Sequence, residues 1–352
     1  MSTHQQSSST TGVAQRSIVV CGLGPIGVRV AQLAVDRPGV VAVVDVDPAA
    51  ARSRLAALPE AVFWERVPLF DSLEAALVAH PGSPVVLSTC SDFPRLTPDL
   101  ATAARHGSHV VTTCEEALWP FVRHPGDSQQ VQELLAAAGT SALAVGINPG
   151  FLMDLLPVVL ATAYPEPDSI VIERKVDIRR RRGPLQEKVG LGLSAQEFAE
   201  RKQRSGIGHR GLDESMHFIA AALGVRWDAI ESDTVAVIND AAQTVDGTHY
   251  PEGAVAGMHN FGTATLAGKV RLRMDLEMSL RIDDPIDRVT FEGSPPLPAT
   301  WTAPGGVPGD DGTAHVVLAA LTRLEELPPG LCTLLDIPGG LRSSWARDET
   351  TA

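Results

Sequence analysis

Cysteine is scarce in this sequence, with four residues among 352. They are Cys21, Cys90, Cys114 and Cys332, and each stands in an apolar stretch. None has the spacing of a metal-binding cluster, alone or with histidine, so we expect no metal. So few thiols argue against a disulfide-stabilised secreted fold and predict reduced cysteines in a cytoplasmic protein.

Positive charge and long apolar runs are also in short supply. Lys and Arg number 29 against 42 Asp and Glu, which gives a net charge of −13. Such an acidic chain is a poor partner for nucleic acid or for an anionic membrane. No apolar run reaches the roughly 18 residues that span a bilayer, and residues 1–15 lack the apolar core of a secretory signal. Because these residues are polar and rich in Ser and Thr, we predict a disordered tail there.

Enough apolar residues remain for a large core, since 44% of the chain is hydrophobic and 20% is charged. The length predicts two domains. Between residues 16 and 150, short apolar runs rich in β-branched residues alternate with helical patterns. This alternation predicts an α/β fold with a doubly wound parallel sheet, here a Rossmann domain that binds a dinucleotide. Within it we expect one helix to span Pro98–His106.

The pattern changes after residue 150. Residues 152–163 look helical, whereas residues 169–178 and 229–301 largely alternate with a period of two, as antiparallel strands do. We predict a second, α+β domain with a mixed, largely antiparallel sheet over residues 151–305. It would shape the substrate pocket, and its exposed strands favour a homodimer. Residues 306–352 would form a C-terminal helix and a segment that return to the first domain.

A glycine-rich motif, GLGPIG, follows the first predicted strand. Gly22, Gly24 and Gly27 have the spacing GxGxxG, and the context of strand, turn and helix is typical of dinucleotide binding. Gly22 would allow the tight turn, Gly24 the close approach of a pyrophosphate, and Gly27 the packing of helix on strand. Amides at the start of the helix would bind the phosphates. The alternative is a glycine-rich turn without a ligand.

Asp45 ends the second predicted strand, 18 residues after Gly27. A carboxylate there accepts hydrogen bonds from a ribose 2′-hydroxyl and repels a 2′-phosphate, so NAD is favoured over NADP. Asp47 is a second candidate for this role, and Arg52 would tolerate a phosphate. The cofactor-binding residues that we predict are Gly22, Leu23, Gly24, Pro25, Ile26, Gly27, Asp45, Val46, Ser88, Thr89, Cys90, Thr113, Cys114, Asn148 and Pro149.

Two adjacent carboxylates, Glu115 and Glu116, follow a predicted strand. Ligands of doubly wound sheets bind beyond the carboxyl ends of the strands, where Ser88 and Thr89 would also lie. A carboxylate in a dry crevice suits a cationic partner, and burial that raises its pKa lets it act as a base. No lysine stands next to the pair in the sequence, so an amine substrate fits better than an alcohol. The alternative is that the acids favour the start of a helix.

The sequence resembles the 2,4-diaminopentanoate dehydrogenase family and its relatives, the native amine dehydrogenases, which are distant cousins of dihydrodipicolinate reductase. The shared blocks are VVCGLGPIG, VVDVDP, VVTTCEE, GINPGFLMD, RRGPLQEKVGLG, GIGHRGLDES, GGVPGDDGTA and PPGLCTLLDIP. The reductase's own His-His and Lys-x-x-x-Ser-Gly-Thr signatures have no counterpart here.

The resemblance implies an NAD(P)-dependent oxidoreductase that acts on the CH–NH2 group of an amine. The amine would become a ketone or aldehyde with release of ammonia, and reductive amination would be the reverse reaction. It also implies that Glu115 or Glu116 is catalytic, without deciding between them. Two alternatives stay open: an imine reductase or diamino-acid dehydrogenase of a biosynthetic pathway, and a catalytically idle nicotinamide-binding regulator.

The candidate substrate-binding residues lie after the first predicted domain. Phe151 and Met153 follow the segment that joins the domains, although core packing at a helix start explains them equally well. His209 precedes a predicted helix, and Thr302 precedes a glycine-rich segment that we expect to border the cofactor. The arginine run at residues 179–182 would clamp a substrate anion or would simply be a solvated loop.

Overall fold

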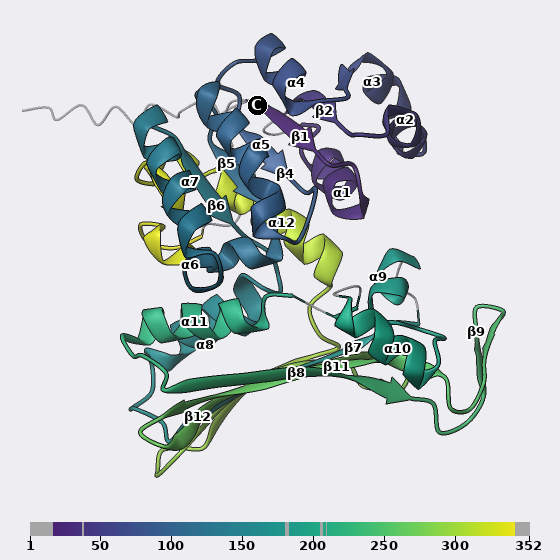
Figure 1. The fold of residues 1–352 in the computed structure, drawn as a ribbon, viewed down its shortest axis with the longest axis vertical. Helices are drawn as coiled ribbons and strands as arrows, with labels where there is room; N and C mark the ends of the chain where they lie inside the picture. Colours follow the sequence, from purple (N-terminus) through teal and green to yellow (C-terminus); the bar gives the residue numbers. More distant parts are fainter. Residues whose placement is uncertain (1–16, 37–38, 180–182, 205–206, 209, 342–352) are drawn as a thin grey trace, which may run out of the picture.

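The computed structural model describes residues 17–36, 39–179, 183–204, 207–208 and 210–341. The tail predicted over residues 1–15 lies outside them. Two sheets organise the structure: a parallel sheet flanked by helices, and a longer sheet that lies across its base (Figure 1). No helix among the described residues is long and apolar enough to cross a membrane.

The first sheet has parallel strands in the order β15-β6-β5-β4-β1-β2-β3. The strands are β1 Ile18–Cys21, β2 Val40–Val44, β3 Leu69–Phe70, β4 Val85–Leu87, β5 Val110–Thr112, β6 Ser141–Ala144 and β15 Gly330–Cys332. The central strands β1 and β4 are buried throughout, which explains their continuous apolar runs. The strand order changes direction between β1 and β4, where a doubly wound sheet opens a ligand crevice. The predicted α/β fold is confirmed.

Helices cover both faces of this sheet (Figure 1). They are α1 Pro25–Leu33, α2 Pro48–Ala56, α3 Ala61–Arg66, α4 Leu73–Ala79, α5 Phe93–Arg105, α6 Pro120–Arg123 and α7 Pro125–Ala138. The predicted start of α5 at Pro98 is wrong, because Asp92 caps the helix by accepting from the amide of Arg95 at 3.1 Å. Pro98 lacks the amide that would bond to the carbonyl of Pro94. The Thr97 hydroxyl donates to that carbonyl instead, at 2.9 Å.

The glycine motif forms the turn between β1 and α1. Gly22 has a φ of +87°, and a Cβ atom there would lie 2.7 Å from the carbonyl oxygen of Ser88. A Cβ atom on Gly27 would lie 1.8 Å from the carbonyl oxygen of Gly22. Side chains at these two positions would therefore force the turn away from the sheet. A Cβ atom on Gly24 would meet nothing within 4 Å, so this part of the turn faces open space.

The second sheet is mixed and has the strand order β14-β13-β7-β12-β11-β8. Its strands are β7 Ser169–Asp177, β8 Ala229–Ile238, β11 Val255–Leu266, β12 Lys269–Ser279, β13 Ile286–Glu292 and β14 Ala299–Pro304, and a hairpin of β9 Gln243–Val245 and β10 Thr248–Tyr250 extends from it. Strands β7 and β12 are parallel, and the other pairs are antiparallel. The mixed, largely antiparallel character predicted from the period of two is confirmed.

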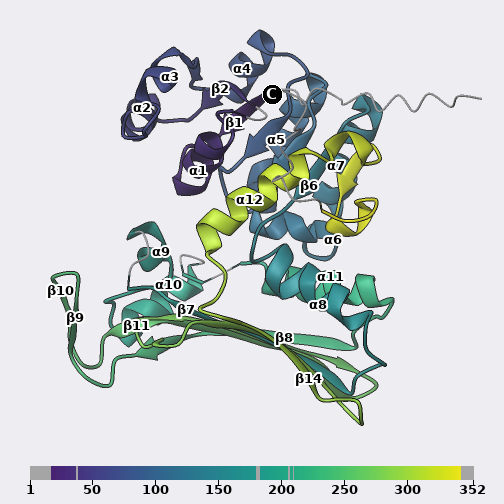
Figure 2. The ribbon, with the colours of Figure 1, turned by 180° about the vertical axis from the view of Figure 1, so that it is seen from behind.

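Alternation along these strands gives the sheet two different faces. Ile170, Ile172 and Leu276 are buried on the inner face, while the positions between them carry charged or partly exposed side chains. The inner face packs against helices that lie between the two sheets (Figures 1 and 2). These are α8 Leu156–Ala161, α9 Gly183–Lys188, α10 Ala195–Gln203 and α11 Leu212–Leu223. No described helix covers the outer face in either view.

The chain finally returns to the parallel sheet. Helix α12, Gly309–Leu321, runs from the second sheet back to the first and packs against α1 (Figure 2). The Arg29 guanidinium donates from Nε to Asp311 at 2.6 Å across this contact. Strand β15 then pairs with β6 and forms the outer edge of the parallel sheet. A strand of three residues is too short to show a period, and β15 was not predicted.

Candidate active site

A crevice of about 360 Å³ opens at the carboxyl ends of the parallel strands. The turn before α1 and the segments after β4, β5 and β6 form one wall, and α9, α12 and the inner face of the second sheet form the other. Its lining residues are Gly24, Pro25, Ile26, Ser88, Thr89, Cys90, Ser91, Thr113, Glu115, Gly146, Ile147, Asn148, Pro149, Arg174, Val176, Leu185, Lys188, Met278, Gly309, Asp310 and Thr313. The crevice therefore lies between the two sheets, where a doubly wound fold binds its ligands.

Nine of the predicted cofactor-binding residues lie together in this crevice with Glu115, one of the two catalytic candidates. The nine are Gly24, Pro25, Ile26, Ser88, Thr89, Cys90, Thr113, Asn148 and Pro149. Gly22, Leu23 and Gly27 shape the turn from behind the wall, and Cys114 is buried under Glu115. Val46 lies after β2 with 93% of its surface exposed.

The predicted substrate-binding residues are not brought together. Met153 is buried in the core, and Phe151 begins a short π-helical turn and is not among the described residues that line the crevice. Thr302 is exposed on β14 and pairs with Arg288, on the face of the second sheet that points away from the crevice. His209 lies outside the described residues.

The arginine run is only partly described. Arg179 donates to Asp177 at 2.9 Å and to Asp283 at 3.1 Å. Its guanidinium is therefore engaged by neighbouring carboxylates, and residues 180–182 lie outside the described part of the chain.

Several crevice residues were missed by sequence reasoning. Lys188 stands in the block RRGPLQEKVGLG, and Asp310 stands in GGVPGDDGTA, so both lie inside blocks that carry the family resemblance. Arg174, Val176 and Met278 occupy inward positions of the second sheet. In one sequence such inward residues cannot be told from ordinary core.

The crevice wall fits a dinucleotide on three observations. Gly24 leaves open space where a phosphate would approach the turn. Helix α1 has no side-chain hydrogen bond at its N-cap, so its first amides face the crevice without a competing carboxylate or hydroxyl. Ser88 Oγ and Asn148 Nδ2 are buried and have no hydrogen-bond partner among the described residues. Buried polar atoms of this kind need a partner, which a bound ligand would supply.

Asp45 follows β2 and lies beside that turn. Its Oδ2 accepts from the amide of Leu23 at 2.8 Å, and its Oδ1 accepts from the amide of Asp47 at 2.9 Å. Each carboxylate oxygen keeps a second acceptor site. Arg54 lies 3.9 Å from Oδ2, whereas Arg52 donates to the carbonyl of Trp64 at 2.6 Å. Arg52 is therefore engaged by the backbone and does not face the ribose position.

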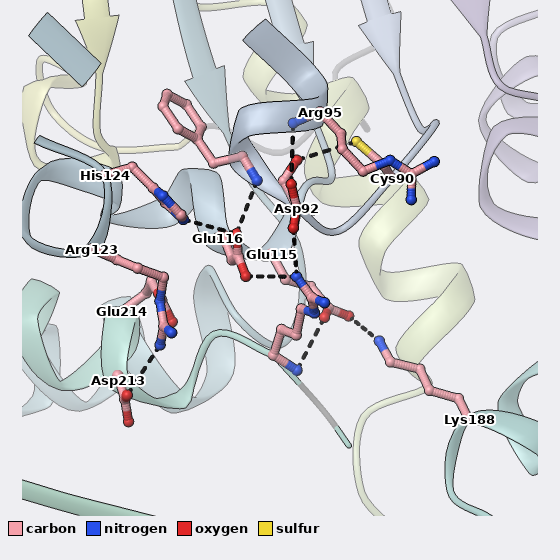
Figure 3. A network of polar contacts seen from close by, with 12 residues as sticks. Cys90, Asp92, Arg95, Glu115, Glu116, Arg123, His124, Lys188, Asp213 and Glu214 are labelled. Carbon is pink, nitrogen blue, oxygen red and sulfur yellow. Dashed lines mark hydrogen bonds and ion pairs between the residues drawn. The ribbon is translucent and has the colours of Figure 1, made fainter. Parts of the chain in front are cut away.

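Glu115 faces the crevice from the start of a 3-10 helix, Glu115–Leu118. Its Oε1 accepts from the Lys188 ammonium at 2.7 Å, and its Oε2 accepts from the backbone amide of Arg210 at 3.2 Å. Figure 3 shows Lys188 reaching Glu115 from the opposite wall. The ion pair therefore spans the crevice between the two sheets.

Glu116 is not among the described residues that line this crevice; it is 6% exposed and borders a second cavity that is described below. Its Oε2 accepts from the amide of Phe93 at 3.0 Å and lies 3.1 Å from His124 Nε2 (Figure 3). Its Oε1 accepts from Arg210 Nη1 at 2.8 Å, and the same nitrogen donates to Asp92 at 2.9 Å. The carboxylate thus joins the starts of α5 and α7 to the loop before α11.

Comparison with known proteins assigns the family. A family model described as the 2,4-diaminopentanoate dehydrogenase C-terminal domain matches residues 151–347, more than half of the chain. The chain belongs to this family. It is an oxidoreductase, as the resemblance implied.

Curated relatives and a solved structure agree with this assignment. The chain is 25% identical to a 2,4-diaminopentanoate dehydrogenase of Acetoanaerobium sticklandii over 334 residues, which cover 91% of this chain and 93% of that protein. It is 26% identical to an amine dehydrogenase of Streptomyces virginiae, over 76% and 80% of the two chains. The solved amine dehydrogenase of Mycobacterium smegmatis has the same fold, with a TM-score of 0.79, 20% identity, and 94% and 97% of the chains covered.

A second cavity, of about 620 Å³, lies on the far side of the Glu115–Glu116 pair in this family member. Ser91 and Lys188 line both cavities. Its walls carry ion pairs, including Arg123 with Glu214 at 2.5 Å and Lys202 with Asp233. Burial raises the pKa of Glu214, while Arg123 opposes that shift. This second space is therefore strongly polar.

A buried carboxylate supports the turn at the domain junction. Asp154 Oδ2 accepts from the amide of Gly150 at 2.6 Å, just after the crevice residues Asn148 and Pro149. Gly150 has a φ of +133°, a conformation that L-residues rarely adopt. Full burial raises the pKa of Asp154 to about 6. The turn therefore rests on a carboxyl group whose charge is costly in the folded state.

This burial predicts a pH dependence of stability. The folded pKa of Asp154 lies above its ordinary value of 3.8, so the folded protein binds the proton more tightly than the unfolded chain. The protonated Asp154 carboxyl contributes fully to the free energy of unfolding below about pH 3.8. This contribution, on the order of 3 kcal/mol, is lost as pH rises through about 6. Asp154→Asn keeps an acceptor for Gly150 and removes the titration. Urea unfolding should show the variant gaining stability relative to wild type between pH 4 and 7. A constant difference over that range would contradict the assignment.

Proposed function

We propose that this protein is a nicotinamide-dependent dehydrogenase that acts on the CH–NH2 group of an amine. The reaction is reversible oxidative deamination to a ketone or aldehyde with release of ammonia. The observation that carries the proposal is the Glu115–Lys188 pair, in which an alkylammonium group already lies 2.7 Å from the crevice carboxylate. A substrate ammonium is chemically the same group, so this carboxylate suits it as a partner.

Glu115 binds the substrate amine in this mechanism. Its carboxylate accepts a proton from the substrate ammonium, which leaves the amine lone pair free to assist the departure of hydride from the neighbouring carbon. The bound nicotinamide supplies the hydride acceptor. Water would then add to the iminium carbon and lose a proton to solvent, and Glu115 would return its proton to the nitrogen. The C–N bond would break as the new hydroxyl loses its proton and becomes the carbonyl group, and ammonia would leave. The amide of Arg210 keeps the Glu115 carboxylate oriented throughout, through its 3.2 Å hydrogen bond.

The second cavity favours one alternative, a diamino-acid dehydrogenase. A substrate whose reacting carbon lies near Glu115 would extend past Lys188 and Ser91, which line both spaces. The charged walls suit a polar substrate better than an alkyl chain, because paired charges that lose water are expensive next to a hydrocarbon. A panel of amines should therefore include amino acids and diamines as well as alkyl amines.

Substitution of each glutamate tests the mechanism. Glu115→Gln should lower kcat by about 10²- to 10⁴-fold, the usual contribution of a general base. Glu116→Gln, its neighbour and matched control, should keep turnover within about tenfold and lower the melting temperature, because Arg210 and His124 lose a charged partner. The assays are NAD+ reduction with amines and NADH oxidation with ammonia and a carbonyl panel.

The other outcomes of these assays are also informative. The reverse pattern would move the catalytic role to Glu116. Full activity in both variants would overturn the mechanism. Tight NADH binding without turnover of any carbonyl by the wild-type protein would favour the catalytically idle regulator.

We infer that NAD is preferred over NADP, because the Asp45 carboxylate would repel a 2′-phosphate. The kcat/KM ratio of NADH to NADPH should exceed about 10 and should fall in Asp45→Asn. Asp47→Asn is the matched control, since Asp47 caps α2 by accepting from the amide of Ala50 at 3.0 Å. It should leave the ratio unchanged. If the wild-type enzyme used NADPH better than NADH, the proposed role of Asp45 would be wrong.

We also propose that the protein is a homodimer joined through the outer face of the second sheet. Val235 is 40% exposed and pairs with His259, whose neighbours Met258 and Asn260 are buried on the opposite, inner face. No described helix covers the outer face (Figures 1 and 2). Val235→Asp should weaken the dimer, while Val122→Asp, at a 55% exposed position on α6, should not. Sedimentation should give twice the 37.2 kDa of one chain for wild type. A single-chain mass at micromolar concentration would reject the dimer.

A further inference from the structure

Two thiols that the proposed reaction does not use lie together beside the crevice. Cys90 follows β4 and lines the crevice, and Cys114 follows β5 and is 2% exposed. Leu87 and Thr112 are register partners, so the two segments leave adjacent strands side by side. The backbone amide of Glu116 donates to the carbonyl of Ser91 at 3.2 Å, which holds the two segments together, and Cys90 packs against the apolar cluster that contains Cys114.

The two sulfur atoms differ in proton affinity. The hydrogen bond from Cys114 lowers the pKa of Cys90 to about 7, with help from the Thr89 hydroxyl and the positive charge of Arg95, against partial burial. The same hydrogen bond and burial raise the pKa of Cys114. Of the two thiols, Cys90 is therefore the one that ionises more readily and the more reactive toward peroxide. A low-pKa, accessible cysteine beside a second thiol is the usual arrangement of a peroxide-sensitive site.

The remaining cysteines lack this arrangement. Burial raises the pKa of Cys332 to about 12, and it also raises the pKa of Cys21. Thiols that stay protonated are poor nucleophiles toward peroxide. Reactivity should therefore be confined to the crevice pair.

We propose that Cys90 and Cys114 form a disulfide when the protein meets hydrogen peroxide, and that this bond blocks the cofactor crevice. The Cys90 thiolate attacks one peroxide oxygen, the O–O bond breaks, and hydroxide leaves, so that Cys90 becomes a sulfenic acid. Cys114 then attacks the Cys90 sulfur, the S–O bond breaks, and hydroxide leaves again. Each hydroxide takes up a thiol proton to become water. Two thiols are thereby oxidised by two electrons, and one peroxide is reduced to two water molecules.

The position of the pair explains why the bond would inhibit. A disulfide holds its sulfur atoms about 2.05 Å apart, much closer than a hydrogen bond. Closing that distance pulls together the segments that carry Thr89 and Ser91 on one side and Glu115 on the other. Cys114 is the N-cap of the 3-10 helix that begins at Glu115, so its movement carries the carboxylate with it. Both the cofactor wall and the amine-binding group would shift.

Intact-mass analysis and NADH binding test the proposal. Wild-type protein treated with hydrogen peroxide should lose about 2 Da and yield a peptide that links residues 90 and 114. Its affinity for NADH should fall at least about tenfold, and dithiothreitol should restore both mass and affinity. Cys332→Ser, the matched thiol-to-hydroxyl control, should respond as wild type does. Cys90→Ser should form no link, and each variant's affinity is compared with its own untreated value.

A second variant keeps the test decisive. Cys114→Ser should stop at the sulfenic acid of Cys90, which dimedone traps. Absence of the linked peptide in wild type, or an equal loss of NADH affinity in Cys90→Ser, would overturn the proposal. A linked peptide with unchanged NADH affinity would overturn the inhibitory role. The mass measurement needs no turnover. A negative result for the disulfide can therefore be distinguished from a failure of the amine mechanism.

Discussion

The buried carboxylate of Glu116 is the contact on which the site depends. It accepts from Phe93 and Arg210 and contacts His124, so it ties the end of β5 to two helices and to the loop before α11. Arg210 in turn orients Glu115 through its backbone amide. A buried charge with this many partners is costly to disturb, because each lost partner leaves a desolvated group behind. The position of Glu115, which we propose binds the amine, therefore depends on the contacts of its buried neighbour.

The different surroundings of Glu115 and Glu116 could not be predicted from the sequence. Glu115 and Glu116 are adjacent and chemically identical, so composition and spacing treat them alike. Their difference comes from Lys188 and Arg210, which lie 73 and 94 residues away in the chain from the glutamates they bind. Long-range partners of this kind leave no local pattern. Thr302 shows the same limit, since only the observed pairing with Arg288 reveals which face of β14 it occupies.

Other parts of the molecule were predictable because their cause is local. The turn at Gly22 and Gly27 needs glycine for steric reasons that the motif itself expresses. Ser88 and Thr89 could be placed at the crevice because they follow a buried strand, and parallel strands bring their carboxyl ends to one edge. Features that rest on a few residues escaped, among them β3 and β15, since two or three residues cannot show a period. An element could be predicted when its sequence pattern was long enough to show a period, whether or not its residues were deeply buried.

Strand β15 makes the parallel sheet depend on a segment that comes late in the chain. Its pairing partner β6 ends at Ala144, yet β15 begins at Gly330, after the whole second sheet has been made. During synthesis the β6 edge stays open until residues 330–332 emerge, and an open edge is a place where other chains pair. The parallel sheet therefore begins first but is completed only after the second sheet, and a chain that stops before β15 would leave the β6 edge unpaired.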